Sequence, residues 1–286
     1  GNGVKALDNI SLSVPKGMFG LLGPNGAGKS SLMRTIATLQ KPDQGNIRFG
    51  KIDVIKRPQA LRRVLGYLPQ EFGVYPGVSA QKLLSHFAVM KGVTDKKERI
   101  YWVDYLLDKT NLLDQSNMAV STFSGGMLRR FGIAVALIAN PRLIIVDEPT
   151  AGLDLAERYA FNTVLSDISE DSVVLLSTHL VEDISDLCQQ VAIIMNGKLV
   201  TQGEPSSLVS LLANKLWQRE VDNNLENEQS SLQPISTRLA AGKRVQTVVS
   251  ETQPGNDFLP LSPTLGDYYF YALSQSSQET VNNTLA

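Results

Sequence analysis

Residues 23–30, GPNGAGKS, have the composition and spacing of a loop that binds phosphate groups. They fit the pattern G-x-x-x-x-G-K-[ST], in which glycines let several backbone N–H groups point at one place. The helix that begins near the lysine adds its positive end. The loop that we expect to surround a nucleoside triphosphate consists of Gly23, Pro24, Asn25, Gly26, Ala27, Gly28, Lys29, Ser30 and Ser31.

Within this loop, each polar side chain has its own expected role. We expect Lys29 to reach the β- and γ-phosphates, Ser30 to offer its hydroxyl to Mg²⁺, and Ser31 to bond an α-phosphate oxygen. A chance match in a glycine-rich turn is the alternative. An apolar strand predicted over 18–23 and a helix predicted over 29–39 favour the phosphate loop.

Two adjacent carboxylates follow a second apolar run, LIIVD at 143–147. An aspartate at the carboxyl end of a buried strand beside a phosphate loop holds Mg²⁺ through water, which is the role expected of Asp147. Glu148 points elsewhere and is a candidate general base for a water in line with the γ-phosphate. The alternative is a pair that merely ends the strand. Together with the phosphate loop, the pair predicts hydrolysis as well as binding.

A second glycine-containing stretch, TFSGGM at 122–127, precedes a long apolar run. A serine hydroxyl and the free amides at a helix start can form an anion site, so Ser124, Gly125 and Gly126 raise the question of what a second glycine-containing stretch would bind. A plain helix cap by Ser124 is the alternative.

The elements that must position these residues follow from the periodicity of apolar residues. We predict a strand over 5–15 in an antiparallel hairpin, helices over about 73–140, and strands over 143–147, 172–177 and 191–200. Apolar strands that alternate with helices favour a mostly parallel sheet covered on both faces.

Composition narrows the class of protein. Hydrophobic residues make up 43% and charged residues 19% of the 286, and the formal net charge is −1 without a basic run. Nucleic acid is therefore not an expected partner. No apolar run approaches the roughly 18–20 residues of a spanning helix, so no direct membrane span is predicted.

Six motifs in this order, GPNGAGKSS, YLPQ, FSGGM, LIIVDEP, AGLD and STH, resemble the nucleotide-binding domain of ABC transporter ATPases over roughly residues 1–204. The resemblance implies an α/β fold: a P-loop NTPase (RecA-like) core with an antiparallel β subdomain and a helical subdomain inserted at about 73–140. Residues 205–286 are then a small C-terminal α+β accessory region with a frayed tail.

The resemblance also implies a dimer. Two such domains pack head to tail around two ATP molecules, and Ser124, Gly125 and Gly126 of one subunit touch the γ-phosphate held by the partner's Lys29. Asp154, in AGLD, lies along the dimer seam. The usual signature is LSGGQ, and Phe123 replaces its leucine; the phosphate contact should survive because the serine and both glycines remain.

Two further roles come from the resemblance. Gln70, in YLPQ, contacts Mg²⁺ or the attacking water, and His179, in STH, contacts the γ-phosphate and orients the water. The segment 71–80 follows Gln70, where a short helix of a membrane partner docks in this family. Its Phe72, Val74 and Tyr75 either receive that helix or pack internally.

The expected function is ATP hydrolysis with Mg²⁺ that drives transport, in the export direction, through a separate integral membrane permease. A second ATPase subunit, identical to the first, completes the sites, and the complex sits at the cytoplasmic face of the membrane. Two alternatives stay open at this point: a soluble ABC ATPase that acts on nucleic acid or ribosomes, and a nucleotide-gated scaffold that does not hydrolyse ATP.

Overall fold

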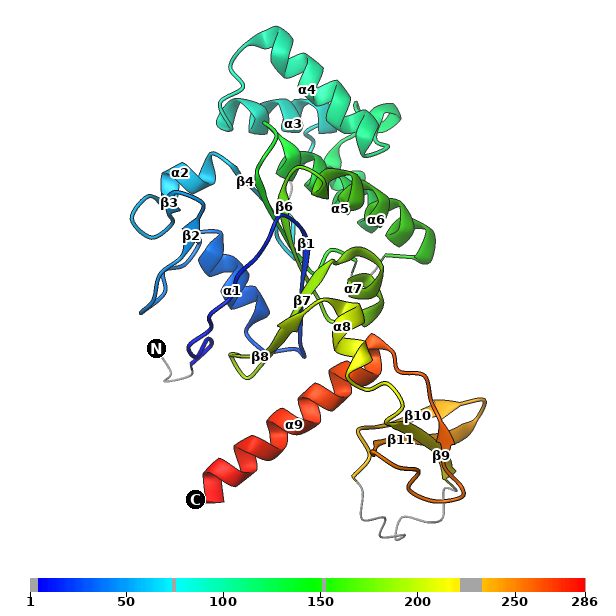
Figure 1. The fold of residues 1–286 in the computed structure, drawn as a ribbon. Coiled ribbons are helices and arrows are strands. Elements are labelled where there is room, and N and C mark those ends of the chain that lie inside the picture. The colour runs from blue at the N-terminus through cyan, green and yellow to red at the C-terminus, as the bar shows by residue number, and fades with distance from the viewer. Residues whose placement is uncertain (1–4, 74–75, 151–152, 222–232, 286) are drawn as a thin grey trace.

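A six-stranded sheet forms the centre of the computed structural model, which describes residues 5–73, 76–150, 153–221 and 233–285, with side chains to residue 276 (Figure 1). The strand order is β4-β5-β6-β1-β7-β8; the first five strands are parallel and β8 is antiparallel to β7. In this order the strands are Leu65–Leu68, Leu143–Asp147, Val173–Thr178, Gly17–Leu22, Gln190–Met195 and Lys198–Gly203.

Helices cover both faces of this sheet, and side-chain alternation along β1 shows why. Phe19 and Leu21 belong to a core formed with α1 and α2, whereas Met18 and Leu22 belong to a core formed with α5, α6 and α7. Apolar side chains fill both cores, as expected of a buried parallel sheet. These helices span Lys29–Ile36 (α1), Pro58–Arg62 (α2), Gly125–Leu137 (α5), Leu155–Ser169 (α6) and Val181–Leu187 (α7).

Between β4 and β5 the described elements are helical. Helices α3 (Ala80–Met90) and α4 (Lys96–Lys109) pack on each other and on α5, away from the sheet (Figure 1). Two 3₁₀ turns, Leu113–Gln115 and Val120–Thr122, lead into α5. The arrangement matches the helical region that the apolar spacing predicts.

The C-terminal part forms its own small sheet. Strand order is β10-β11-β9-β12, all pairs antiparallel. Helix α9 (Leu265–Leu285) returns to the main body, where Tyr268, Tyr269 and Ala272 join the core beneath α7 and α8. The remaining elements are α8 (Pro205–Ser210), β9 (Leu216–Val221), β10 (Ser236–Ala240), β11 (Lys243–Val249) and β12 (Leu259–Pro260). No helix in the described residues is both long enough and apolar enough to cross a bilayer.

The strand predicted at the start of the chain differs from what is observed. Residues 5–15 contain no regular strand; their alternating apolar side chains pack on the α1 core without a ladder of backbone hydrogen bonds. Two short antiparallel strands follow α1 and form the hairpin β2 (Arg48–Phe49) and β3 (Ile52–Asp53). Helix α9 continues to Leu285, and residues 275–285 contain neither glycine nor proline to interrupt it; the fraying of its end stays a prediction.

Residues 191–200, predicted as one strand, form the hairpin β7–β8. Asn196 and Gly197 both have positive φ, 49° and 75°, as the two central residues of a type I′ turn require. The Asn-Gly pair is therefore the reason why the chain reverses here.

Candidate functional site

The glycine-rich loop joins β1 to α1 and depends on glycine at defined positions. Gly26 and Gly28 have φ of +81° and +106°, a left-handed conformation that other residues rarely adopt. A Cβ at Gly23 would lie 2.2 Å from the backbone oxygen of Ile194 in the neighbouring strand. The loop shape therefore follows directly from its glycines.

Backbone contacts brace this loop from the side of β7 and β8. The amide of Gly197 donates to the carbonyl of Ala27 (2.9 Å), and the amide of Asp8 donates to the carbonyl of Gly197 (2.7 Å). A Cβ at Gly28 would lie 2.6 Å from the carbonyl oxygen of Ala6. The segment before β1 and the β7–β8 turn thus hold the loop between them.

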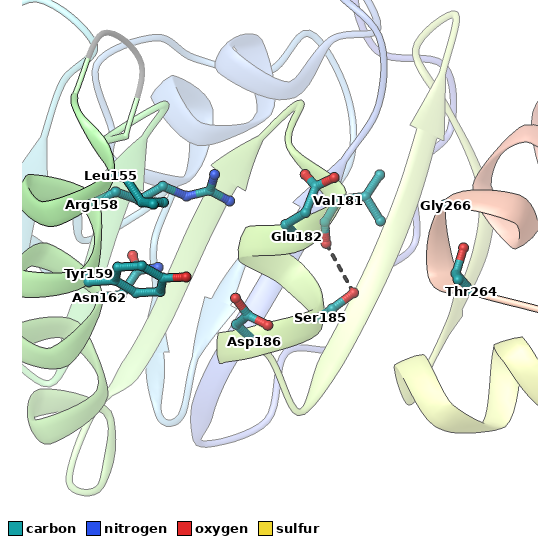
Figure 2. A pocket seen from close by; sticks show the side chains of 10 residues that line it. All are labelled: Leu155, Arg158, Tyr159, Asn162, Val181, Glu182, Ser185, Asp186, Thr264 and Gly266. Carbon is teal, nitrogen blue, oxygen red and sulfur yellow. Dashed lines mark hydrogen bonds between the residues drawn. The ribbon is translucent and has the colours of Figure 1, made fainter. Parts of the chain in front are cut away.

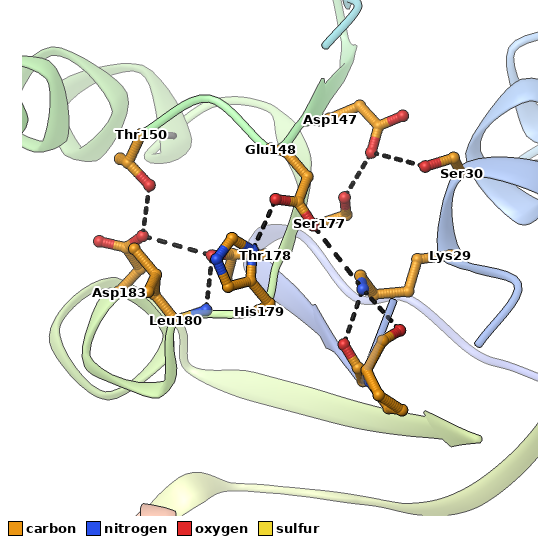
Figure 3. Close-up of polar contacts among 12 residues, drawn as sticks. Lys29, Ser30, Asp147, Glu148, Thr150, Ser177, Thr178, His179, Leu180 and Asp183 are labelled. Atoms are coloured by element: carbon orange, nitrogen blue, oxygen red, sulfur yellow. Dashed lines mark hydrogen bonds and ion pairs between the residues drawn. The ribbon is translucent and has the colours of Figure 1, made fainter. Parts of the chain in front are cut away.

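Lys29 lies inside the loop. Its ammonium donates to the carbonyl oxygens of Gly23 (2.7 Å) and Pro24 (3.2 Å) and is 3.7 Å from Glu148 Oε1 (Figure 3). Burial lowers the pKa of Lys29, while the nearby charges of Glu148 and Asp147 oppose that shift. A single cation therefore faces both carboxylates from the loop.

Asp147 and Ser30 supply oxygen atoms at one point. The Ser30 hydroxyl donates to Asp147 Oδ1 (3.3 Å), and the Ser177 hydroxyl donates to the same oxygen (2.5 Å). Mg²⁺ prefers such hard oxygen ligands and keeps several waters and phosphate oxygens. The described residues contain no group of three or more histidine, cysteine, aspartate or glutamate side chains placed to hold a metal ion by themselves. One carboxylate with a hydroxyl therefore suits Mg²⁺ that is shared with a nucleotide.

Gln70 leaves the same edge of the sheet. Strand β4 pairs with β5 so that Leu68 lies opposite Val146, the residue before Asp147. Because the strands are parallel, Gln70 follows two residues after the end of β4, at the edge of the sheet where β5 ends in Asp147, and it is exposed. This placement is consistent with its expected role.

Glu148 departs from strand geometry. Its φ is +49°, uncommon for a residue with a side chain, and such strained positions concentrate at functional sites. Glu148 as a whole residue is 8% exposed. Its Oε2 lies 2.7 Å from Nδ1 of His179, which follows the end of β6. Which of the two atoms carries the proton depends on the histidine tautomer. The pair can hold a water and accept its proton.

A buried carboxylate that sequence reasoning missed holds the surrounding loops. Asp183 in α7 is 0% exposed and accepts from Thr150 Oγ1 (2.6 Å) and Arg158 Nε (2.6 Å). Thr178 Oγ1 lies 3.4 Å from the same carboxylate (Figure 3). Asp183 therefore links the segments that carry Glu148 and His179 to helix α6. No local pattern marks Asp183 in the sequence, because its closest partners, Thr150 and Arg158, lie in segments that are distant along the chain.

The stretch around Ser124 does not join this group within the subunit. Ser124 begins α5, accepts from the amide of Met127 (3.2 Å) and is exposed; among described side chains it has no hydrogen bond to Lys29 or Asp147. Gly125 has open space around it, whereas a Cβ at Gly126 would strike the carboxylate of Glu157.

Asp154 begins α6 and caps it, accepting from the amide of Glu157 (2.7 Å). Ala151 and Gly152 of the same motif lie outside the described residues. Val74 and Tyr75, predicted to receive a partner helix or to pack internally, also lie outside them. Phe72 is described and packs internally on Phe131, with ring centroids 6.0 Å apart.

A cavity of about 500 Å³ lies between α6, α7 and the start of α9 (Figure 2). Leu155 and Tyr159 line it from α6, and Thr264 and Gly266 line it from the segment that opens α9. Leu155, which lines the cavity, directly follows Asp154 in the chain, and Lys29 is not among the lining residues.

Comparisons with known proteins agree on one family. The family model described as ABC transporter matches residues 7–151. YbhF of Escherichia coli K12, a probable multidrug ABC transporter ATP-binding protein, is 30% identical over 242 residues, which cover 83% of this chain and 42% of YbhF. DrrA of Streptomyces peucetius, a daunorubicin/doxorubicin resistance ATP-binding protein, is 34% identical over 75% of this chain and 66% of DrrA.

A solved structure of an ATP binding subunit of an ABC transporter superposes with a TM-score of 0.67 at 25% identity, covering 74% of this chain and 89% of that one. The likeness confirms the predicted P-loop NTPase fold. The chain spans less than two thirds of the length of YbhF and of DrrA.

Proposed function

This chain belongs to the ABC transporter family, and we propose that it is an ATP-binding, ATP-hydrolysing subunit that powers export through a separate membrane permease. One observation carries the proposal: Glu148 lies between Lys29 (3.7 Å) and His179 (2.7 Å), at the edge of the sheet where the phosphate loop opens. The two relatives named for multidrug transport and drug resistance support the direction. The permease would hold the subunit at the cytoplasmic face.

The proposed chemistry uses the groups at this edge of the sheet. Lys29 and the loop amides would bind the phosphates of ATP, and Ser30 with Asp147 would hold Mg²⁺, assisted by Gln70. The metal neutralises phosphate charge when bound. Glu148 accepts a proton from water, and His179 keeps that carboxylate oriented.

The proposed assembly is a head-to-tail homodimer around two ATP molecules. Ser124 is exposed and has no described contact with the Lys29 group of its own subunit, which supports a role at a second subunit's nucleotide. Leu155 (64% exposed) and Tyr159 (61%) place apolar surface directly after Asp154, where the seam would run (Figure 2). We propose residues 1–204 as the ATPase domain and 205–286 as an accessory region.

The test is the Glu148→Gln variant of the full chain. We expect phosphate release to fall by about a hundredfold or more, because the base is lost, and ATP with Mg²⁺ to trap a dimer visible by light scattering. Ser124→Arg in the Glu148→Gln background is the matched control: it should keep ATP binding and lose the dimer. Equal hydrolysis by wild type and Glu148→Gln would refute the proposed base.

Co-purification with a polytopic membrane protein tests the transport role, and recovery with nucleic acid or ribosomes would contradict it.

A further inference from the structure

Helix α5 contacts two segments that, in the proposed function, bind different nucleotides of the dimer. Its first turn carries Ser124, and Arg129 lies five residues later on the same helix. Arg129 Nη1 donates to the backbone oxygen of Pro69 (3.2 Å), the residue immediately before Gln70. One side chain therefore joins the helix that presents Ser124 to the segment that presents Gln70.

Three aromatic rings in edge-to-face contact form a second connection between the same two segments. The Phe131 ring contacts Phe123 on one side (6.1 Å, 81°) and Phe72 on the other (6.0 Å, 71°), in edge-to-face geometry. Phe131 is 0% exposed. A Cβ at Gly132 would lie 2.4 Å from Leu68 Cδ1, so the helix backbone packs closely on the end of β4. Helix α5 and the segment that leads to Gln70 are therefore in close contact at several points.

The guanidinium of Arg129 interacts electrostatically with the carboxylates of the candidate site. Burial lowers the pKa of its guanidinium, and Asp147 and Glu148 oppose that shift, so the cation lies within the field of both carboxylates. Arg130, its neighbour, instead donates through Nη1 to the carbonyl of Asn111 (3.1 Å), on the side of α4. Two adjacent arginines on one helix thus have separate surroundings.

We propose that Arg129 is a positioning residue that holds Gln70 toward the Mg²⁺ and nucleotide of its own subunit while its helix presents Ser124 to the partner's nucleotide. The inference rests on the proposed function. A γ-phosphate bound at Ser124 draws on α5, and the Arg129–Pro69 hydrogen bond carries that displacement to Gln70. Occupancy of one site in the dimer is thereby felt at the other.

The test compares Arg129→Met with Arg130→Met in the full chain. In the Glu148→Gln background, the Mg²⁺ concentration at half-maximal ATP-dependent dimerisation should rise about tenfold for Arg129→Met and stay within about twofold for Arg130→Met. In the otherwise wild-type chain, kcat should fall about tenfold or more for Arg129→Met, with ATP affinity of the monomer unchanged. Arg129→Lys keeps the charge and should restore part of both.

Four outcomes decide between these possibilities. A rise in the Mg²⁺ requirement confined to the Arg129 variants supports the assignment. An equal response of Arg129→Met and Arg130→Met overturns it while leaving the proposed function intact. If Arg129→Met does not fold, Arg129→Lys with a wild-type Mg²⁺ requirement and wild-type kcat overturns it as well. Absence of both dimerisation and hydrolysis in the parent proteins would remove the proposed function and this inference together.

Discussion

Replacing Asp183 with asparagine tests how the loops around the carboxylates are held. Asp183 is fully buried, and its two oxygens accept separately from Thr150 Oγ1 and Arg158 Nε at 2.6 Å. Asparagine keeps the shape of the side chain but loses the charge. One of its two terminal atoms is also a donor, which can face the Thr150 hydroxyl but not the guanidinium. The substitution therefore removes the ion pair and keeps the packing.

The expected cost follows from the geometry. Breaking a buried ion pair costs about 3–5 kcal/mol, and a hydrogen bond to a charged group contributes about 1.5–3 kcal/mol. The Arg158 side chain is 22% exposed, so water recovers part of its solvation and the lower end, about 3 kcal/mol, applies. At roughly 2–4 °C per kcal/mol, the midpoint of thermal unfolding should fall by about 6–12 °C.

Thermal unfolding followed by circular dichroism measures this loss, and phosphate release measures its functional effect. Lys109 and Asp167 form a surface pair at 3.5 Å with side chains 27% and 56% exposed, so Asp167→Asn should cost less than about 1 kcal/mol. Hydrolysis should fall only in the Asp183 variant, because Asp183 touches the segments next to Glu148 and His179. A midpoint for Asp183→Asn within about 2 °C of wild type would refute the reasoning.

Two further predictions concern single groups. Lys29→Ala should weaken ATP binding by about a hundredfold, or about 3 kcal/mol, because the cation that faces the phosphates is lost; equilibrium titration of the monomer checks it, and an unchanged Kd would contradict it. Burial raises the pKa of Cys188 from 9.0 to about 12, so the folded chain keeps a proton that the unfolded thiol releases. The free energy of unfolding should therefore fall as pH rises from about 9 toward 12, by at most about 1.4 kcal/mol per pH unit, and Cys188→Ala should lack this component. Alkylation of native Cys188 at pH 8 should be slow, and rapid labelling would show that the thiol is not buried.

The parts of the site that sequence reasoning located are those whose chemistry lies in consecutive residues. The phosphate loop and the pair Asp147–Glu148 combine residue type, short spacing and a flanking apolar strand, so local pattern alone places them at a strand end. Parallel pairing of β1, β5 and β6 then brings them together, because carboxyl ends of parallel strands share one edge.

The parts that it missed depend on contacts between distant segments. Asp183 meets Arg158 and Thr150 only after α6 and α7 pack, and Arg129 meets Pro69 across 60 residues of chain. Nothing in their local sequence distinguishes them from surface charges. The turn at Asn196–Gly197 is different, since the dipeptide itself favours a hairpin and was available as a signal.

The β7–β8 turn also lies between the phosphate loop and the C-terminal part of the chain. The amide of Gly197 in this turn donates a hydrogen bond to the carbonyl of Ala27 in the phosphate loop. Strand β8 starts at the next residue and is followed by α8 and then by the C-terminal sheet. The β7–β8 hairpin therefore contacts the phosphate loop at its turn and helix α9 of the C-terminal region along its strands.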